Sequence, residues 1–167
     1  MKEMLSIKGH DRYAYWPITE PAPFRWPEGG GLAVYVALNL EQYSFGDGML
    51  DELVAGGGPP PDVINYGWLD YGNRVGAWRL LELAAGLGLP LTCLVNSEVY
   101  DHCPGLIEAF RAGGHEIAAH GRTNGERQDV LAEPAEKALI DAATARITQA
   151  EGRPPAGWLG PWIARAP

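Results

Sequence analysis

Two side chains suited to acid–base chemistry follow the most strand-like stretches of the sequence. Glu41 ends the segment Leu32–Glu41, which is rich in β-forming residues. His120 follows the short apolar run Glu116–Ala119 and precedes Gly121. In parallel α/β folds the carboxyl ends of the strands meet at one edge of the sheet, where ligands bind. A pairing of Glu41 with His120 would supply a base and a general acid, or two metal ligands.

Other polar residues surround these two in the sequence. Side chains alternate along a strand, so Asn39 is expected on the same face as Glu41. The loop after His120 carries Asn124 among several other polar residues. His115 lies five positions before His120, so the two cannot face the same way along a strand. The same spacing excludes the helical metalloprotease motif, whose two histidines are four positions apart.

The remaining elements alternate between helix and strand. Residues 42–72 are punctuated by glycines and prolines and predict a long loop. Apolar spacing and stop signals then predict the following segments in order: helix Asn73–Leu87, strand Leu91–Val95, helix Asp101–Ala112, strand Glu116–Ala119, helix Pro134–Glu151 and strand Gly157–Leu159. This βαβ alternation is typical of an α/β fold with a parallel sheet. Four strands form an open sheet or half of a barrel, because a complete (β/α)₈ barrel needs roughly 200 residues or more.

The first 30 residues differ in composition from the rest. Prolines prevent a regular helix there, while the aromatic residues are too many for a free tail. We expect an extended N-terminal arm that packs on a domain spanning residues 31–167. The arm would cover the surface or, alternatively, serve as a lid or a subunit contact.

Composition excludes several classes of partner. The net charge of −8 and the absence of a basic run argue against nucleic acid. No apolar stretch approaches the roughly 20 residues that span a bilayer, so no membrane is expected. Met1–His10 lacks an apolar signal region, and we expect a cytoplasmic protein. Cys93 and Cys103 do not form a disulfide framework.

Four spaced motifs resemble the polysaccharide deacetylase superfamily, also called the NodB-homology superfamily. They are L-N-L-E, Y-G-N-R-V-G-A-W-R-L-L, G-H-E-I-A-A-H-G and G-R-P-P-A-G-W-L-G-P-W, within a similarity that runs from about Gly9 to Trp162. They resemble most the branch of metal-independent allantoinases and related cyclic-amide hydrolases. The resemblance implies a distorted (β/α) barrel, of which this chain holds a part, and hydrolysis of a non-peptide C–N bond.

The resemblance also implies a set of site residues. Metal-dependent members place two aspartates at the first strand end and two histidines four apart after the third strand. The matching positions here are Asn39 with Glu41, and His120 with Asn124. An amide is a poor ligand for a divalent metal beside imidazole, so we expect no metal or other cofactor. The alternative is a metal such as zinc held by Glu41, His120 and Asn124.

Three further residues complete the implied substrate pocket. Arg74 would bind an anionic or carbonyl group of the substrate, or is otherwise a surface or helix-cap arginine. Pro161 and Trp162 match the third motif of the family, which lines the pocket. Family members continue beyond this motif, whereas here the chain ends in I-A-R-A-P. We therefore expect either a truncated protein or an open sheet edge that another copy covers, which predicts a homo-oligomer.

The leading hypothesis is an amidohydrolase acting on a small cyclic amide or ureide such as allantoin. Glu41 would position or activate water, and His120 would stabilise or protonate the reacting group. One alternative is a metal-dependent deacetylase of N-acetylated sugars. The other is a catalytically inactive fragment.

Overall fold

The computed structural model describes residues 6–20, 24–46 and 61–163. Contacts divide the chain into two units, residues 1–34 and 35–167. In the described part of the first unit, the regular element is a short 3₁₀ turn, η1 (Pro27–Gly29). Beside it the rings of Phe24 and Trp26 meet edge to face with centroids 5.0 Å apart. The rest of this described part is extended, as its prolines predict.

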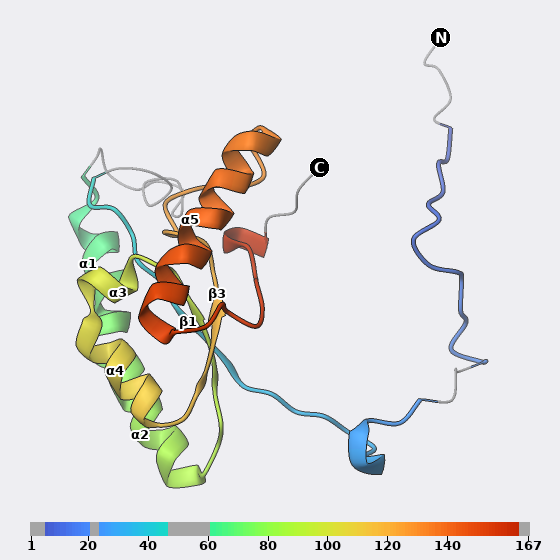
Figure 1. Ribbon diagram of the computed structural model, residues 1–167, viewed down its shortest axis with the longest axis horizontal. Helices are drawn as coiled ribbons and strands as arrows, with labels where there is room; N and C mark the ends of the chain where they lie inside the picture. The colour runs from blue at the N-terminus through green and yellow to red at the C-terminus, as the bar shows by residue number, and fades with distance from the viewer. Residues whose placement is uncertain (1–5, 21–23, 47–60, 164–167) are drawn as a thin grey trace. The chain divides into compact units, whose positions relative to one another are not determined.

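The second unit alternates strands and helices in the predicted order (Figure 1). Strands β1, β2 and β3 are mutually parallel and lie in that order in one sheet. Trp158 forms a single parallel bridge to Ala119, where the sequence predicts a fourth strand. The elements are β1 (Ala37–Leu40), α1 (Val63–Tyr71), η3 (Gly72–Gly76), α2 (Ala77–Leu87), β2 (Thr92–Val95), α3 (Val99–His102), α4 (Pro104–Ala112), β3 (Glu116–Ala119), α5 (Glu133–Glu151) and η4 (Pro161–Ile163). This is the parallel α/β architecture of a partial (β/α) barrel.

Strand register assigns the side chains to two faces of the sheet. Leu40, Val95 and Ala119 lie side by side in one row and are buried. They share a hydrophobic core with Phe110 of α4 and Ile147 of α5. Leu40 therefore turns the carboxyl end of β1 toward the helical core. The side chains of alternate residues, among them Asn39, point to the opposite face.

The first helix corrects the sequence-based prediction. Helical structure begins at Val63 rather than at Asn73, because the Asp62 carboxylate caps it by accepting from the backbone N–H of Asn65 at 3.0 Å. Gly67 lies inside this helix, where a single glycine costs only about 1 kcal/mol. The helix runs through the π-helical segment η3 into α2 and ends at Gly88, whose φ of 62° is left-handed.

The predicted second helix is present in two pieces. It begins at Val99 instead of Asp101 and breaks at Cys103 before Pro104. A residue that precedes proline is restricted away from the helical region, which explains the non-helical backbone of Cys103, with φ −134° and ψ 52°. The break at Cys103 therefore separates α3 from α4.

Helices α1 and α2 expose a stripe of apolar side chains that we call the α1–α2 stripe. It comprises Trp68, Leu80, Leu83 and Leu87, which are 70%, 44%, 57% and 62% exposed. Trp68 and Leu80 line a cavity of about 300 Å³ together with residues of β1. Since β1 pairs only with β2 among the described residues, its other edge opens beside this stripe.

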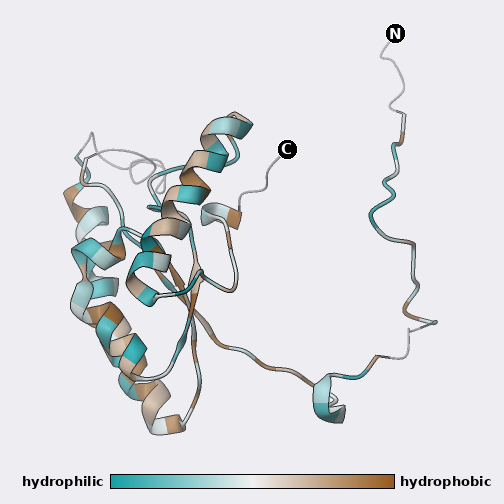
Figure 2. Cartoon of the chain, viewed as in Figure 1, coloured by the Kyte–Doolittle hydropathy of each residue, from teal (hydrophilic) through white to brown (hydrophobic). Residues whose placement is uncertain are grey.

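The helices carry mixed surfaces. In Figure 2 hydrophilic and hydrophobic residues alternate along α5, as expected of a helix with one face on a core. Within the described ranges, no helix has both the length and the apolar character needed to cross a membrane.

Candidate active site

Three polar side chains form a row at the carboxyl edge of the sheet. They are Glu41, Asn96 and His120. Each directly follows the last paired residue of its strand, which is Leu40, Val95 or Ala119 respectively. The ladder continues through them, because the Asn96 N–H donates to the Leu40 carbonyl at 3.1 Å and the His120 N–H to the Val95 carbonyl at 2.9 Å. Strand alternation then directs all three side chains to the face opposite the helical core.

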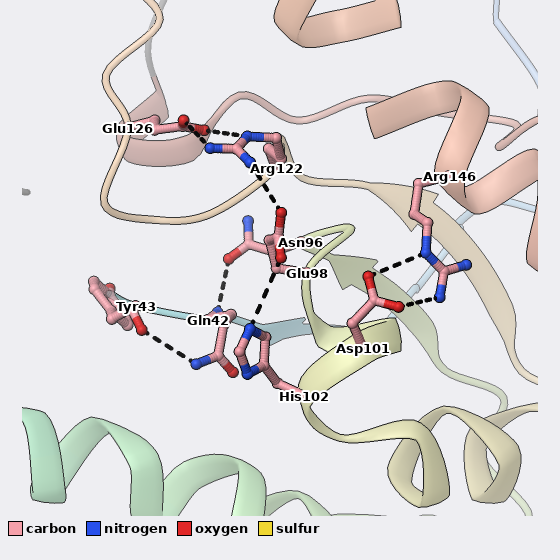
Figure 3. Close-up of polar contacts among 9 residues, drawn as sticks. All are labelled: Gln42, Tyr43, Asn96, Glu98, Asp101, His102, Arg122, Glu126 and Arg146. Atoms are coloured by element: carbon pink, nitrogen blue, oxygen red, sulfur yellow. Dashed lines mark hydrogen bonds and ion pairs between the residues drawn. The ribbon is translucent and has the colours of Figure 1, made fainter. Parts of the chain in front are cut away.

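Asn96 connects the two outer members of the row. Its side chain is fully buried, and its Oδ1 accepts from the backbone N–H of Gln42 at 2.8 Å (Figure 3). Its Nδ2 donates to the backbone carbonyl of His120. One amide thus fixes the backbone beside Glu41 and at His120. Sequence reasoning missed this residue, although a lone asparagine directly after an apolar strand was a usable signal.

His120 is 2% exposed and presents one ring nitrogen to Glu41. Its Nδ1 lies 2.6 Å from the carbonyl oxygen of Leu159. A carbonyl only accepts hydrogen bonds, so we assign the ring proton to Nδ1. Nε2 then lies 3.5 Å from Glu41 Oε1, within ion-pair distance but too far for a strong hydrogen bond. The predicted neighbours Glu41 and His120 are therefore brought together.

Hydrogen bonds hold Glu41 as a carboxylate. Oε1 accepts from Asn39 Nδ2 at 3.1 Å and Oε2 from the Tyr43 hydroxyl at 2.9 Å. Asn73 donates its Nδ2 to the backbone carbonyl of Glu41 at 2.7 Å. Burial raises the pKa of Glu41, but the neighbouring His120 ring and the hydrogen bonds from Tyr43 and Asn39 outweigh it and lower this pKa below its usual value. Glu41 is therefore ionised at neutral pH.

Tyr43 links Glu41 to the predicted residue Asn124. Asn124 is 4% exposed, and its Nδ2 donates to the Tyr43 hydroxyl at 3.0 Å. Burial raises the pKa of Tyr43, and the hydrogen bond from Asn124 offsets this only in part. Tyr43 thus remains a protonated donor to Glu41. Trp162 joins the cluster by donating its indole N–H to the backbone carbonyl of Asn124 at 3.0 Å.

Two buried acceptors in this cluster lack a protein partner. Asn124 Oδ1 and His120 Nε2 make no hydrogen bond to any described residue. Buried polar atoms are nearly always paired, so such atoms mark places where a ligand's N–H or O–H groups can bind. The cluster is therefore short of donors, not of acceptors.

Pro161 positions the turn after β3. Gly121 has a φ of +73°, and a Cβ there would come within 2.8 Å of the Pro161 ring. Only glycine adopts this left-handed backbone and also leaves room for the Pro161 ring without a shift of the backbone. The buried Pro161 thus packs on the turn that presents His120 and brings the neighbouring Trp162 to Asn124.

Arg74 is not part of this cluster. It lies in η3 with its side chain 73% exposed, and its Nε donates to the Asp70 carboxylate. The structure therefore offers no contact between Arg74 and the residues around Glu41.

The donor set does not fit a catalytic zinc ion. Among the described residues no group of three or more His, Cys, Asp or Glu side chains could hold a metal. The three residues named for the metal alternative supply one carboxylate, one imidazole and an amide, and Asn124 turns its Nδ2 toward Tyr43. Catalytic zinc sites use three protein ligands drawn from His, Asp, Glu and Cys. These three side chains therefore do not fit a catalytic zinc centre.

Comparison with known proteins identifies similar folds. No family model and no curated protein matches the chain. Among solved structures, the PuuE allantoinase is 27% identical with a TM-score of 0.65, over 80% of this chain and 47% of that one. A probable polysaccharide deacetylase from Pseudomonas aeruginosa PAO1 is 26% identical with a TM-score of 0.59, over 74% and 45%. A putative polysaccharide deacetylase from Mycobacterium smegmatis is 25% identical with a TM-score of 0.66, over 85% and 47%.

The chain spans about half the length of these structures. Their names denote hydrolases of two kinds, an allantoinase and deacetylases of polysaccharides. The matches cover 74% to 85% of this chain. The chain accordingly has the fold of the NodB-homology, or polysaccharide deacetylase, superfamily, as its four motifs predict.

Proposed function

We propose that this chain carries the acid–base residues of a hydrolase for non-peptide C–N bonds, acting on a small cyclic amide or ureide. The observation that carries the proposal is the pair of the half-buried Glu41 and the buried His120 at the carboxyl edge of the sheet, with Oε1 and Nε2 3.5 Å apart. Similarity to an allantoinase and to polysaccharide deacetylases supports hydrolysis as the class of reaction.

In the proposed reaction Glu41 orients a water molecule and His120 moves its proton. The anionic Glu41 accepts a hydrogen bond from the water, while its other oxygen is held by Tyr43. Water attacks the amide carbonyl as its proton passes to His120 Nε2, and the imidazolium is stabilised by the adjacent carboxylate. The C–O bond forms, the C–N bond breaks, and Nε2 returns the proton to the leaving nitrogen. Nδ1 keeps its proton on the Leu159 carbonyl throughout.

One unpaired acceptor favours a substrate with N–H groups. Asn124 Oδ1 is buried without a partner among the described residues, whereas the lone pair of His120 Nε2 faces the attacking water in the proposed reaction. A cyclic amide or ureide carries a ring N–H group that satisfies the Asn124 acceptor, which a carboxylate or ester lacks. The donor set described above does not favour the metal-dependent deacetylase alternative.

The proposal is tested by assaying the chain against cyclic ureides, cyclic imides and N-acetylated sugars. We expect hydrolysis of a cyclic ureide or imide, and a loss of about 100-fold to 10,000-fold in kcat for His120→Ala and Glu41→Gln. His10→Ala is the matched control, because His10 is exposed and lies in the other unit. Full turnover in His120→Ala would remove the assignment. Stoichiometric zinc by elemental analysis, with activity only on N-acetylated sugars, would favour the deacetylase.

We further propose that a second copy of the chain covers the α1–α2 stripe and the open edge of β1. Exposed apolar stripes of this kind mark interfaces. Exposed residues of both charges, Arg79 and Glu82, lie beside the stripe on α2. In a dimer with two-fold symmetry, the α2 helices of the two copies would run antiparallel. Arg79 of one copy would then lie against Glu82 of the other, so the surface is self-complementary.

A further inference from the structure

The outer edge of β1 presents backbone groups in a regular pattern. The carbonyls of Val36 and Leu40 face β2, because they accept hydrogen bonds from that side at 2.9 and 3.1 Å. The N–H and C=O of one residue point to the same side of a strand, and the side alternates from each residue to the next. The groups that face away from β2 therefore belong to Tyr35, Ala37 and Asn39. Among the described residues, β1 pairs only with β2, so no strand covers this edge.

The carboxyl end of the same edge is already closed. Glu41 continues the alternation, and its outward carbonyl accepts from Asn73 Nδ2 at 2.7 Å. Asn73 lies in η3 and is 7% exposed, so its amide takes the place that a neighbouring strand would occupy there. A strand that pairs with this edge is therefore left with the backbone groups of Tyr35, Ala37 and Asn39.

The open part of the edge lacks the usual protection against pairing. Natural edge strands are protected by prolines, charged side chains or bulges. The segment from Tyr35 to Leu40 reads Y-V-A-L-N-L, without proline or charge. Its strand residues pair with β2 in an unbroken register, so no bulge interrupts them. Tyr35 is 81% exposed and Ala37 is exposed as well, which leaves the edge accessible to a further strand.

The space beside this edge continues into the α1–α2 stripe. The cavity of about 300 Å³ lies along β1, and Trp68 and Leu80 of the stripe line its other side. One partner can therefore cover both surfaces. A two-fold axis perpendicular to β1 makes the two β1 strands antiparallel and also makes the two α2 helices antiparallel. That is the arrangement in which Arg79 lies against Glu82 of the other copy, so strand pairing and helix pairing require the same symmetry.

We propose that the β1 strands of two copies pair antiparallel across a two-fold axis at Ala37, and that each copy contributes Tyr35 to the site of the other. The three available residues are symmetric about Ala37. In this register Ala37 pairs with itself, and Tyr35 pairs with Asn39 of the other copy. The inference rests on the second copy advanced under the proposed function, but it does not depend on which bond the protein cleaves.

This register brings the partner's Tyr35 to the acid–base pair. Directly opposed residues of antiparallel strands share a face of the sheet, and Asn39 shares its face with Glu41. Asn39 also donates to Glu41 Oε1 at 3.1 Å. Diagonal neighbours lie within reach of an aromatic side chain, so the ring from the second copy reaches the carboxylate.

Tyr35 supplies what this side of the site lacks. The Glu41 side chain is 26% exposed, whereas that of His120 is 3% exposed. A ring from the second copy would cover the exposed side of Glu41 and exclude water from it. The Tyr35 hydroxyl would also add a hydrogen-bond donor beside a cluster that holds unpaired acceptors among the described residues.

The first test removes the outward N–H of Ala37. Proline has no N–H, and at an edge position that faces away from the ladder it leaves the pairing with β2 intact. Because Ala37 pairs with itself, Ala37→Pro removes two hydrogen bonds from the dimer. We expect the dimer Kd from analytical ultracentrifugation to rise at least about 10-fold. Ala37→Ser keeps the N–H and is the matched control, with a Kd within about 3-fold of wild type. Circular dichroism checks that both variants fold.

The second test maps the register without disrupting the strand. Tyr35 is replaced by the photo-crosslinking residue p-benzoylphenylalanine in a mixture of isotope-labelled and unlabelled chains. Mass spectrometry then separates cross-links between copies from those within one chain. We expect cross-links between copies, from position 35 to residues 39–41. The same probe at Val130, 68% exposed and outside the stripe, is the control and should not reach residues 39–41.

The outcomes separate this inference from the proposed reaction. The expected cross-link together with dissociation by Ala37→Pro supports the strand pairing even when no compound is hydrolysed, a result that contradicts the reaction instead. An oligomer that Leu83→Glu dissociates and Ala37→Pro leaves intact supports the stripe but overturns the strand pairing. Cross-links confined to one chain, or directed elsewhere in the second copy, overturn the register. A monomeric wild-type chain overturns the inference, whether or not it hydrolyses a cyclic ureide.

Discussion

Replacing Asn96 by alanine tests whether one buried amide holds the site together. The change removes the acceptor of the Gln42 N–H and the donor to the His120 carbonyl, both at a side chain with no solvent exposure. Each partner left unsatisfied in the interior costs about 1 to 3 kcal/mol. The two together predict a loss of about 2 to 6 kcal/mol in the free energy of unfolding, which is a large part of the total for a domain.

The assay is urea denaturation followed by circular dichroism, with the m-value as a check on two-state unfolding. Asn65→Ala is the control, because the Asn65 side chain is only half-buried and bonds to the nearby Asp62. It should cost less than about 1 kcal/mol, since Asp62 keeps its hydrogen bond to the Asn65 backbone N–H. Asn96→Asp is also expected to lower the free energy of unfolding. The aspartate retains an acceptor for the Gln42 N–H but sets an oxygen against the His120 carbonyl. An Asn96→Ala chain as stable as Asn65→Ala would refute the reasoning.

Two further predictions concern the turn after β3 and the exposed stripe. Gly121→Ala should destabilise the fold by about 2 to 4 kcal/mol and lower activity, because the left-handed backbone and the Pro161 contact at 2.8 Å both oppose a Cβ. Gly152→Ala is the comparison, with a similar φ of +70° but nothing within 4 Å, and should cost about 1 to 2 kcal/mol. In light scattering the chain should be a homo-oligomer that Leu83→Glu dissociates, whereas Val130→Glu, at a site 68% exposed outside the stripe, leaves it intact. A monodisperse monomer would count against the proposed interface.

The pattern of residues along the chain was enough to locate the sheet and the edge of it that carries Glu41 and His120. The strand Glu116–Ala119 has the predicted bounds, and Leu91–Val95 is shorter by one residue. Apolar runs bounded by glycine define strands locally, and the βαβ order implies that they are parallel. Glu41 and His120 follow two such strands, so their proximity at one edge was predictable before any contact was known.

Only the tertiary structure revealed what holds that pair in place. Asn96 bonds to Gln42 across 54 positions of sequence, and Asn124 bonds to Tyr43 across 81. Such partners depend on the register between strands and on the paths of the loops, which no local pattern specifies. Arg74 shows the same limit, because its motif left open a substrate-binding or a surface or helix-cap role, and only its position in η3 directs it to Asp70. Local propensity determines elements, whereas the partners of polar side chains are determined by how those elements pack.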